Sequence, residues 1–506
     1  MSALVNALDR LAVGIDGFDA IADGGLPLGR TTLVAGTAGS GKTLFGVQFL
    51  VSGVERFDQN GVIVTFEEAP RALQQNVLSI GWDLPKHVRD NRIAIVDVSP
   101  EPEGATIEAG HFDLTALMAR IEHAVNRVNA KRVLLDALGA VFPQLSDNVV
   151  IRRELHRIAV GLRRLGVTAL MTVERSDEYG AIARFGVEEF VADNVIVMRN
   201  QLEAERRRRT IEVLKFRGAS HRKGEFSFTI GAPDGITVVP LSSIGSNQPP
   251  SGDRVSTGNG ELDDMCGGGI FENSIALVSG ATGTGKTLMV AEFVKAAVQS
   301  RERALLFAFE ESRDQLIRNA ASWGVDYERA ERLGLLRIVC RHPESIGLED
   351  HLVAIKQETE AFGPQRLAID SMSALERGTS AKAFREFVIG ITGHVKAKGM
   401  AAMFTNTTAM LVGRETIAET HMSTVTDSIF LLRYVELCGE VRRGIAVLKM
   451  RGSQHDRDIR EYSIGANGMT IRGPFESVNG ILAGAPTRGR ITEHDRLSTM
   501  FAHSYA

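Results

Sequence analysis

The feature that most constrains this chain is an internal repeat: its two halves carry the same pattern about 240 residues apart. Residues 13–43 (VGIDGFDAIADGGLPLGRTTLVAGTAGSGKT) match residues 257–287 (TGNGELDDMCGGGIFENSIALVSGATGTGKT). Matching residues at an offset of 244 are Asp19 and Asp263, Gly25 and Gly269, and Lys42 and Lys286. The offset becomes 243 for Glu67 and Glu310, and 234 for Asp136 and Asp370. A few loop deletions explain this drift, so the repeat predicts two domains of one fold.

The boundary is expected in LSSIGSNQPPSGD (241–253), which is poor in apolar residues and rich in Ser, Gly and Pro. A chain of 506 residues accommodates two domains of about 250 residues each. We therefore predict an N-terminal domain over 1–240, a linker over 241–254, a C-terminal domain over 255–485 and a tail over 486–506.

Composition favours a globular protein of the cytoplasm. The net charge of -4 argues against a protein that coats nucleic acid, although it permits a local basic groove. The three cysteines, Cys266, Cys340 and Cys438, are widely spaced and form no CxxC pair, which suits packing residues in a reducing compartment. The sequence begins with no basic region followed by an apolar core, and no apolar run reaches membrane-spanning length. We expect no membrane association.

Short apolar runs alternate with amphipathic segments in both halves. TTLVAG, GVIVTFE, IAIVD, RVLLD and TALMTVE read as buried parallel strands, whereas FDLTALMARIEHAVNRV has helical spacing. The alternation predicts an α/β fold, with two tandem P-loop NTPase domains that each have a mostly parallel sheet covered by helices on both faces.

Two glycine-rich loops indicate where ATP binds. GTAGSGKT (36–43) and GATGTGKT (280–287) satisfy G-x-x-x-x-G-K-[ST], and each follows a predicted strand and opens a predicted helix. The glycines let backbone N–H groups surround phosphates at a helix N-terminus, the lysine reaches the β- and γ-phosphates, and the threonine hydroxyl binds Mg²⁺. The predicted nucleotide-binding residues here are Gly36, Thr37, Ala38, Gly39, Ser40, Gly41, Lys42, Thr43, Leu44, Gly280, Thr282, Gly283, Thr284, Gly285, Lys286, Thr287 and Leu288.

Carboxylates at predicted strand ends supply the remaining chemistry. Asp136 and Asp370 are candidates to hold Mg²⁺ together with Thr43 and Thr287; the alternative is that each aspartate only caps a helix. The adjacent pairs Glu67-Glu68 and Glu310-Glu311 are candidate catalytic bases that polarise a water or a hydroxyl, with Glu310 also near the metal. A solvated strand end is their alternative interpretation.

Beyond these motifs, nearly the whole chain resembles the KaiC family of circadian-clock ATPases and autokinases, which have RecA-like domains. The resemblance runs through EYGAIARFGVEEFVADN, LEAERRRRTIEVLKFRGASHRKGE, LDDMCGGGIF, AFREFVIGITG, HMSTVTDSIFLLRYVE, LKMRGSQHD and AGAPTR. It implies a two-tiered homohexamer with ATP between neighbouring subunits.

In that arrangement, LKFRG and LKMRG are similar to segments that send a lysine and an arginine to the next subunit's nucleotide. These residues are Lys215 and Arg217 in the first half and Lys449 and Arg451 in the second. A cation supplied in trans makes hydrolysis depend on assembly. From sequence alone, a solvated K-x-R on a strand remains an alternative. The resemblance adds His221, His455 and Trp323 to the nucleotide-binding set.

Ser423 and Thr424 in HMSTVTD match the adjacent hydroxyl pair that the family phosphorylates and dephosphorylates. A shift of 234 positions reaches Glu189 and Phe190, so the N-terminal half offers no acceptor hydroxyl. The resemblance thus implies ATP hydrolysis in both halves and serine/threonine autophosphorylation in the second, with Glu310 as the base. Unmodified turn or strand residues are the alternative.

Two departures from the family bear on partners. Ala418 stands where studied members have a third threonine, and the tail RGRITEHDRLSTMFAHSYA is short and diverges at its end. Because the family binds KaiA through this region, a KaiA-like partner is in doubt. Residues 102–117 resemble the region where KaiB docks, so a KaiB-like partner is favoured, and an output signalling protein is a further candidate.

Two other functions fit the loops. A RecA/RadA-type DNA-dependent ATPase would need a basic loop in a channel, but the basic run Arg206 to Arg209 follows Glu203 and Glu205 and reads as a solvated or inter-subunit face. Salt-sensitive DNA binding would favour that function. A scaffold that only binds nucleotide is disfavoured because both lysines, both threonines and both glutamate pairs are intact.

Overall fold

The computed structural model divides the chain into two compact units, Met1–Ser243 and Ile244–Ala506. It describes residues 9–99, 114–140, 148–182, 191–203, 206–239, 251–408, 422–437, 439–475, 478–479, 481 and 487–488.

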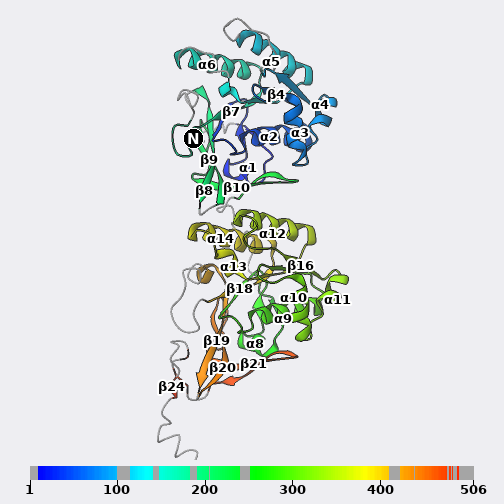
Figure 1. Ribbon diagram of the computed structural model, residues 1–506, viewed down its shortest axis with the longest axis vertical. Helices are drawn as coiled ribbons and strands as arrows, with labels where there is room; N and C mark the ends of the chain where they lie inside the picture. Colours follow the sequence, from blue (N-terminus) through cyan, green and yellow to red (C-terminus); the bar gives the residue numbers. More distant parts are fainter. Residues whose placement is uncertain are drawn as a thin grey trace, which may run out of the picture. The chain divides into compact units, whose positions relative to one another are not determined.

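The N-terminal unit is built on a nine-stranded sheet (Figure 1). Its central strand carries the first glycine-rich loop. The order is β11 (Gly235–Val238), β10 (Glu225–Gly231), β9 (Arg206–Phe216), β8 (Asn194–Glu203), β3 (Thr31–Gly36), β7 (Thr168–Glu174), β6 (Arg132–Asp136), β4 (Gly61–Thr65) and β5 (Ile93–Asp97). Strands from β8 to β5 are parallel, whereas β9, β10 and β11 continue the sheet antiparallel. A short pair, β1 (Arg10–Leu11) and β2 (Leu26–Pro27), precedes β3.

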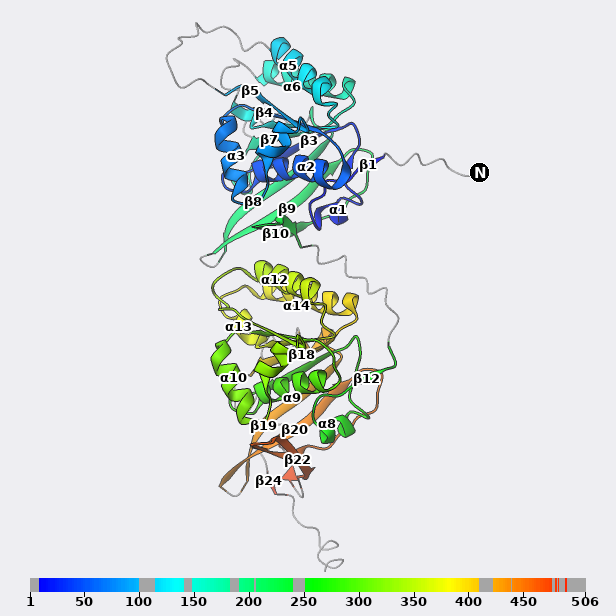
Figure 2. The same cartoon turned by 90° about the vertical axis from the view of Figure 1, so that its right-hand side faces the viewer.

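Helices cover both faces of this sheet because its strands are apolar on both sides. Val34 packs in one core with Phe45 of α2, while Leu33 packs in another with Ile121 of α5 and Leu155 of α6. Figures 1 and 2 show α5 and α6 together on one side of the sheet and α2 on the other. The helices are α1 (Phe18–Ile21), α2 (Lys42–Phe57), α3 (Pro70–Leu78), α4 (Leu84–Arg89), α5 (Leu114–Val128) and α6 (Asn148–Arg164), with a 3₁₀ turn at Leu138–Ala140.

The C-terminal unit repeats this topology. Its sheet has the order β16 (Leu336–Cys340), β15 (Ala304–Ala308), β17 (Arg366–Asp370), β18 (Ala401–Thr407), β14 (Ile275–Gly280), β19 (Ser428–Leu437), β20 (Glu440–Met450), β21 (Arg460–Gly465) and β22 (Gly468–Pro474). The helices are α8 (Gly260–Met265), α9 (Lys286–Gln299), α10 (Arg313–Ser322), α11 (Tyr327–Arg332), α12 (Leu348–Phe362), α13 (Met372–Glu376) and α14 (Ala381–Lys398). Two short pairs, β12 (Arg254–Val255) with β13 (Ile270–Phe271) and β23 (Val478–Asn479) with β24 (Thr487–Arg488), complete it. The predicted α/β class with two tandem domains is confirmed.

The aspartate and the glycine that first revealed the repeat have structural roles. The Asp19 carboxylate accepts hydrogen bonds from the backbone N–H groups of Val13 (2.8 Å) and Gly14 (3.0 Å). Gly25 has a φ of 116°, and a Cβ there would lie 2.2 Å from the carbonyl oxygen of Leu11. Both residues fix the turn that leads from β1 to β3. They therefore recur in the two halves because the fold requires them, and not because they take part in catalysis.

Two of the three cysteines lie in or against the core of the C-terminal unit. Cys266 is buried in the core of the C-terminal unit, where burial raises the pKa of its thiol to about 12, and Cys340 packs against the same core. Cys438 lies outside the described residues. No helix in the described part of the chain has both the length and the apolar content needed to cross a membrane.

Candidate nucleotide-binding site

The first glycine-rich loop joins β3 to α2 in a conformation that requires glycine. Gly39 and Gly41 have φ angles of 72° and 93°, in the left-handed region that glycine adopts freely. At Gly36 a Cβ would lie 2.6 Å from the carbonyl oxygen of Met198 on β8. The Ser40 hydroxyl closes the loop by donating to the carbonyl of Thr37 (2.8 Å). Backbone N–H groups at the start of α2 are therefore available for phosphate oxygens.

The second loop, between β14 and α9, has the same geometry. Gly283 and Gly285 have φ angles of 80° and 98°. The Thr284 hydroxyl donates to the carbonyl of Ala281 (2.7 Å), as Ser40 does in the first loop, while Tyr434 donates its hydroxyl to the carbonyl of Thr282 (3.3 Å). Both predicted loops thus have the shape of phosphate-binding loops.

Each loop lysine curls over its own loop. Lys42 donates from Nζ to the carbonyl of Thr37 (2.8 Å), and Lys286 donates to the carbonyls of Gly280 (2.9 Å) and Ala281 (3.0 Å). Burial lowers the pKa of both ammonium groups, an effect that nearby carboxylates oppose. The ammonium groups therefore lie over the loops, beside acidic side chains.

Asp136 and Asp370 end β6 and β17 and are 7% and 8% exposed. The Thr172 hydroxyl donates to Asp136 (2.5 Å), and Thr405 makes the matching bond to Asp370. Burial raises the pKa of both carboxyls, while hydrogen bonds from the loop threonines Thr43 and Thr287 lower it. Each aspartate is thus adjacent to its loop threonine.

This pairing of a hydroxyl with a carboxylate offers the hard oxygen donors that Mg²⁺ prefers. Four of the five predicted metal-binding residues, Thr43, Asp136, Thr287 and Asp370, offer such donors; the fifth, Glu310, pairs with Arg377.

The glutamate pairs follow β4 and β15, at the same sheet edge as the aspartates. Burial raises the pKa of Glu67, and the charges of Glu174 and Asp136 raise it further. Glu68 also has a pKa raised by burial, and it accepts a hydrogen bond from Asn76 (2.5 Å). The two members therefore differ: Glu67 is influenced by the charges near the loop lysine, and Glu68 is bound to α3.

In the C-terminal unit, Glu310 and Glu311 show a similar division. Glu310 accepts from the hydroxyl of Ser371 (3.3 Å) and pairs with Arg377, whereas Glu311 accepts from Asn319 on α10 (3.1 Å). Burial raises the pKa of Glu311. The ion pair with Arg377 distinguishes Glu310 from Glu67, because the matching residue in the first half is Pro143, outside the described residues.

Sequence reasoning missed three charged residues near the first loop. Glu174 ends β7, and its charge raises the pKa of Lys42 and of Glu67. Glu178 accepts from the Thr37 hydroxyl (2.7 Å) and from the N–H of Asn200 (3.0 Å), and Arg209 donates to the carbonyl of Gly39 (3.4 Å). The strand-terminal carboxylate of Glu174 was readable from the pattern that identified Asp136. The other two depend on tertiary contacts.

The basic run on β9, expected to form a solvated or inter-subunit face, is mixed: Arg207 is exposed, whereas Arg206, Arg208 and Arg209 are partly buried. The side chain of Arg208 is only 11% exposed; it donates to the Ser227 hydroxyl (2.6 Å) and pairs with Glu203 (3.7 Å). Arg207 donates to the carbonyl of Asn200 (2.8 Å). These arginines support the sheet and the loop of their own unit.

The K-x-R segments lie at the end of the sheet opposite to their own phosphate loop. Lys215 pairs in register with Val195, which pairs with Leu33 near the start of β3, whereas the loop begins at Gly36, whose register partner on β8 is Met198. The N–H of Arg217 bonds to the carbonyl of Asp193 (3.2 Å), one residue before β8. From residue 31 to residue 36 a strand extends about 16 Å. These cations are therefore far from the phosphates that their own loop would hold.

The second half has the same arrangement. Lys449 pairs in register with Ile429, and the N–H of Arg451 bonds to the carbonyl of Asp427 (2.9 Å), at the start of β14 and β19. The predicted histidines flank these segments: the His221 ring contacts that of Phe216 at 5.5 Å, and His455 is half-buried. Trp323 ends α10, where it packs against the core.

The predicted phosphate acceptors lie next to these cations. Residues 422–425 are helical, and neither a turn nor a strand; Ser423 is half-buried and Thr424 is exposed. Lys449 donates to the carbonyls of Ser423 (2.6 Å) and Thr426 (2.7 Å), and Arg451 donates to the carbonyl of Thr424 (2.7 Å). The acceptors thus lie before β19, away from the loop of their own unit. Glu189, Phe190 and Ala418 lie outside the described residues.

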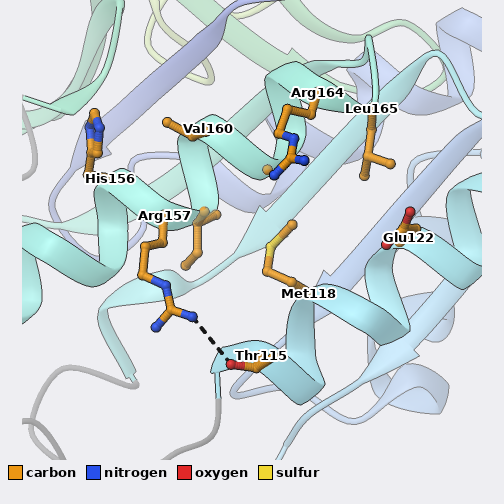
Figure 3. A pocket seen from close by; sticks show the side chains of 10 residues that line it. Thr115, Met118, Glu122, His156, Arg157, Val160, Arg164 and Leu165 are labelled. Carbon is orange, nitrogen blue, oxygen red and sulfur yellow. Dashed lines mark hydrogen bonds between the residues drawn. The ribbon is translucent and has the colours of Figure 1, made fainter.

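A separate hollow of about 700 Å³ lies between α5 and α6 (Figure 3). Met118 and Glu122 of α5 face Arg157 and Arg164 of α6 across it, and Arg157 donates to the hydroxyl of Thr115 (3.3 Å). None of the predicted nucleotide-binding residues lines this hollow. It belongs to the outer helical layer of the N-terminal unit.

Comparison with known proteins places both halves of the chain in one group. A family model described as "ATPase: KaiC" matches residues 11–243 and again 255–475. The chain is 55% identical over 496 residues to the "Circadian clock protein KaiC3" of a Synechocystis species, and the match covers 98% of each chain. It is 53% identical over 492 residues to the "Circadian clock oscillator protein KaiC" of Synechococcus elongatus, covering 97% of this chain and 94% of the relative.

Proposed function

Since the chain belongs to the KaiC family of ATPases, we propose that it is a clock-type ATPase and autokinase whose active sites form between neighbouring subunits of a homohexameric ring. The observation that supports this most directly is the position of the K-x-R segments. Along the strand direction, the arginines lie about 16 Å and the lysines about 10 Å from the phosphate loop of their own unit. A second subunit can present them to the nucleotide instead.

In the hydrolysis that we propose, backbone N–H groups of each loop bind the phosphates of ATP, and Lys42 or Lys286 neutralises their oxygens. Thr43 with Asp136, and Thr287 with Asp370, would hold Mg²⁺, which neutralises charge on the phosphates when bound. Glu67 and Glu310 would orient the attacking water, with Glu68 and Glu311 beside them. The neighbour's Lys215 and Arg217, or Lys449 and Arg451, would stabilise charge that develops on the transferred phosphoryl group.

In the C-terminal unit we propose a second reaction, phosphoryl transfer to Ser423 and Thr424 of the adjacent subunit, with reversal or hydrolysis removing the phosphate. Glu310 would take the hydroxyl proton. The location of the acceptor pair supports this proposal, because it shares the end of the sheet with Lys449 and Arg451. Whatever brings these cations to a neighbour's nucleotide brings the hydroxyls with them.

For partners, we propose a KaiB-like protein on the N-terminal unit. Residues 102–113 of the expected docking segment lie outside the described part, but the segment continues into α5, whose Thr115 lines the hollow of Figure 3. The divergent tail gives no support to a KaiA-like partner. We further propose a cytoplasmic location and an output signalling protein as the recipient of the clock state.

Mixing two inactive variants tests the shared site. Both variants carry Glu310→Gln and Glu311→Gln, which are intended to silence the second unit. One variant also has Lys42→Ala, which removes the loop lysine, and the other has Arg217→Ala, which removes the cation that acts in trans. Each variant alone should lose most hydrolysis. Random rings from an equal mixture should regain about a quarter of the turnover of chains that carry only Glu310→Gln and Glu311→Gln, because one interface in four combines an intact loop with an intact arginine.

Native mass spectrometry of the same samples reports whether mixed rings form. Mixed rings that stay inactive would contradict a site shared between subunits, as would full activity of a lone monomer.

A further inference from the structure

An aspartate connects the K-x-R segment to the phosphate-loop strand in both units; its side chain is buried in the first unit and 15% exposed in the second. Asp193 is 2% exposed, and its N–H donates to the carbonyl of Thr31 at the start of β3 (3.1 Å). Asp427, its counterpart, donates its N–H to the carbonyl of Ile275 (2.9 Å) and accepts the N–H of Ile275 on its carboxylate (3.1 Å). A carboxylate buried this far needs cationic partners.

In the N-terminal unit those partners are two arginines outside the K-x-R segment. Arg30 donates to Asp193 at 3.2 Å and Arg163 of α6 donates at 2.7 Å. The guanidinium of Arg217 is exposed and makes no hydrogen bond or ion pair within the described residues. With Asp193 already neutralised twice, Arg217 is not drawn back onto its own subunit.

In the C-terminal unit the first of these arginines is missing, because the residue that matches Arg30 is Ser274. Lys396 of α14 takes the place of Arg163 and donates to Asp427 at 3.0 Å. The second partner is Arg451 itself, at 3.5 Å from Asp427, and it also donates to the carbonyl of Thr424 (2.7 Å). The candidate trans-acting arginine is thus held by its own subunit, against the acceptor pair.

The surroundings of Arg217 strengthen the contrast. A groove of about 520 Å³ is lined by Arg217 with Arg30, Arg152, Arg153 and Arg163, and among the described residues Asp193 is its only acidic lining residue. A groove with this charge attracts phosphate groups. In the second half, the positions matching Arg153 and His156 of this groove hold Glu386 and Ile389.

We propose that residue 30 and its counterpart 274 are positioning residues that determine how freely the trans-acting arginine reaches the neighbouring nucleotide. Arg30 occupies Asp193 and leaves Arg217 available to the neighbour. Ser274 leaves Asp427 to hold Arg451 beside Thr424, so hydrolysis in the second unit is restrained. This inference rests on the proposed function, because it presupposes that both arginines act in trans.

Exchanging the two residues tests the inference in both directions. The first exchange is made in chains that carry Glu67→Gln and Glu68→Gln, so that turnover comes from the second unit. There Ser274→Arg should raise kcat about two- to fivefold and leave KM little changed. This factor corresponds to the free energy of one exposed ion pair. Ser274→Gln is the matched control for side-chain size and should not raise kcat. In chains carrying Glu310→Gln and Glu311→Gln, Arg30→Ser should lower kcat by a similar factor, and Arg30→Lys should retain most of it.

A purely structural role for these positions predicts a different result, namely losses of activity in both exchanges together with lowered thermal stability. Unchanged kcat in both exchanges would overturn the inference. Because Ser274 is buried, the Arg30→Ser arm, which only removes atoms, decides the matter if Ser274→Arg does not fold.

Two further variants separate this inference from the proposed function. Arg217→Ala and Arg451→Ala should each lower turnover of their unit. If neither does, the shared-site proposal itself fails. If both do while the exchanges have no effect, only the role of residues 30 and 274 is rejected.

Discussion

At the scale of single residues, Glu292 and Gln48 make corresponding hydrogen bonds with side chains of different chemistry. They occupy matching positions, 244 apart, on α9 and α2. Gln48 donates to the carbonyls of Asp234 (2.9 Å) and Ile236 (3.2 Å) and accepts the N–H of Ile236 (2.7 Å). Glu292 accepts the N–H of Met469 (2.7 Å). Each side chain connects a phosphate-loop helix to the edge strand of its sheet, but only one of them can ionise.

Burial raises the pKa of Glu292 to about 7, which makes the stability of the C-terminal unit depend on pH. Asn259 and the Met469 N–H oppose this shift, as does the charge of Lys295, while that of Glu261 adds to it. Because the folded state binds the proton more tightly, the stabilisation is complete below pH 4.5, the usual pKa, and is lost as pH rises through 7. A shift of this size corresponds to about 3 kcal/mol.

We therefore expect the unfolding free energy of the wild-type chain to fall between about pH 5 and about pH 8. Glu292→Gln should remove this dependence, and the reciprocal Gln48→Glu should introduce one in the N-terminal unit. Denaturant titrations at several pH values measure both. A wild-type profile that Glu292→Gln leaves unaltered would show that another group titrates.

How far single residues were predictable depended on whether their role was local. The loop lysines and threonines and the strand-end aspartates occupy positions that a short motif specifies, so the sequence identified them. Glu178 and Arg209 contact the first loop although they lie far from it along the chain, and no spacing in the sequence predicts these contacts. Arg30 looked like an ordinary residue before β3, and only the fold brings it to Asp193.

At the scale of elements, the turn before each phosphate-loop strand depends on glycine. Gly25→Ala would place a methyl group 2.2 Å from the carbonyl oxygen of Leu11, at a φ of 116°. We expect it to lower the unfolding free energy by at least about 2 kcal/mol. Gly29→Ala is the matched control: its φ is also positive, 68°, but the added methyl meets nothing within 4 Å, so the cost should be about 1 kcal/mol.

Thermal or denaturant unfolding of the two variants compares them directly. Equal destabilisation would mean that backbone conformation alone matters there, and not the close approach to Leu11.

The elements themselves were predictable to different degrees. Parallel strands buried on both faces read as continuous apolar runs, so β3 to β7 were visible in the sequence. The antiparallel extension from β9 to β11 was harder to predict, because its strands mix charged and apolar residues; β9 begins with four arginines. The helical state of residues 422–425 was also missed, since a segment of four residues shows no helical periodicity.

At the scale of the whole molecule, phosphorylation should require more than one subunit. Ser423→Ala with Thr424→Ala should abolish incorporation of labelled phosphate from ATP, because this change removes both proposed acceptor hydroxyls. Mixing this double variant with a Lys286→Ala chain, which keeps the hydroxyls but lacks the loop lysine, should restore label on the Lys286→Ala copies only. A mass tag on one variant distinguishes them by intact-mass spectrometry.

Label that persists in the double variant alone would reject these acceptors. Label that no mixture restores, although mixed rings form, would point to transfer within one subunit.

In each unit the phosphate loop and the K-x-R segment lie at opposite ends of the sheet. This separation has a consequence for any closed ring of such chains. Under the proposed sharing of sites, every copy contributes to two catalytic centres with each of its units, as host of one and as helper of the next. A copy that has lost both functions silences two centres, so activity declines faster than the share of damaged chains. A minority of altered subunits therefore lowers the activity of the whole ring by more than their share of its chains.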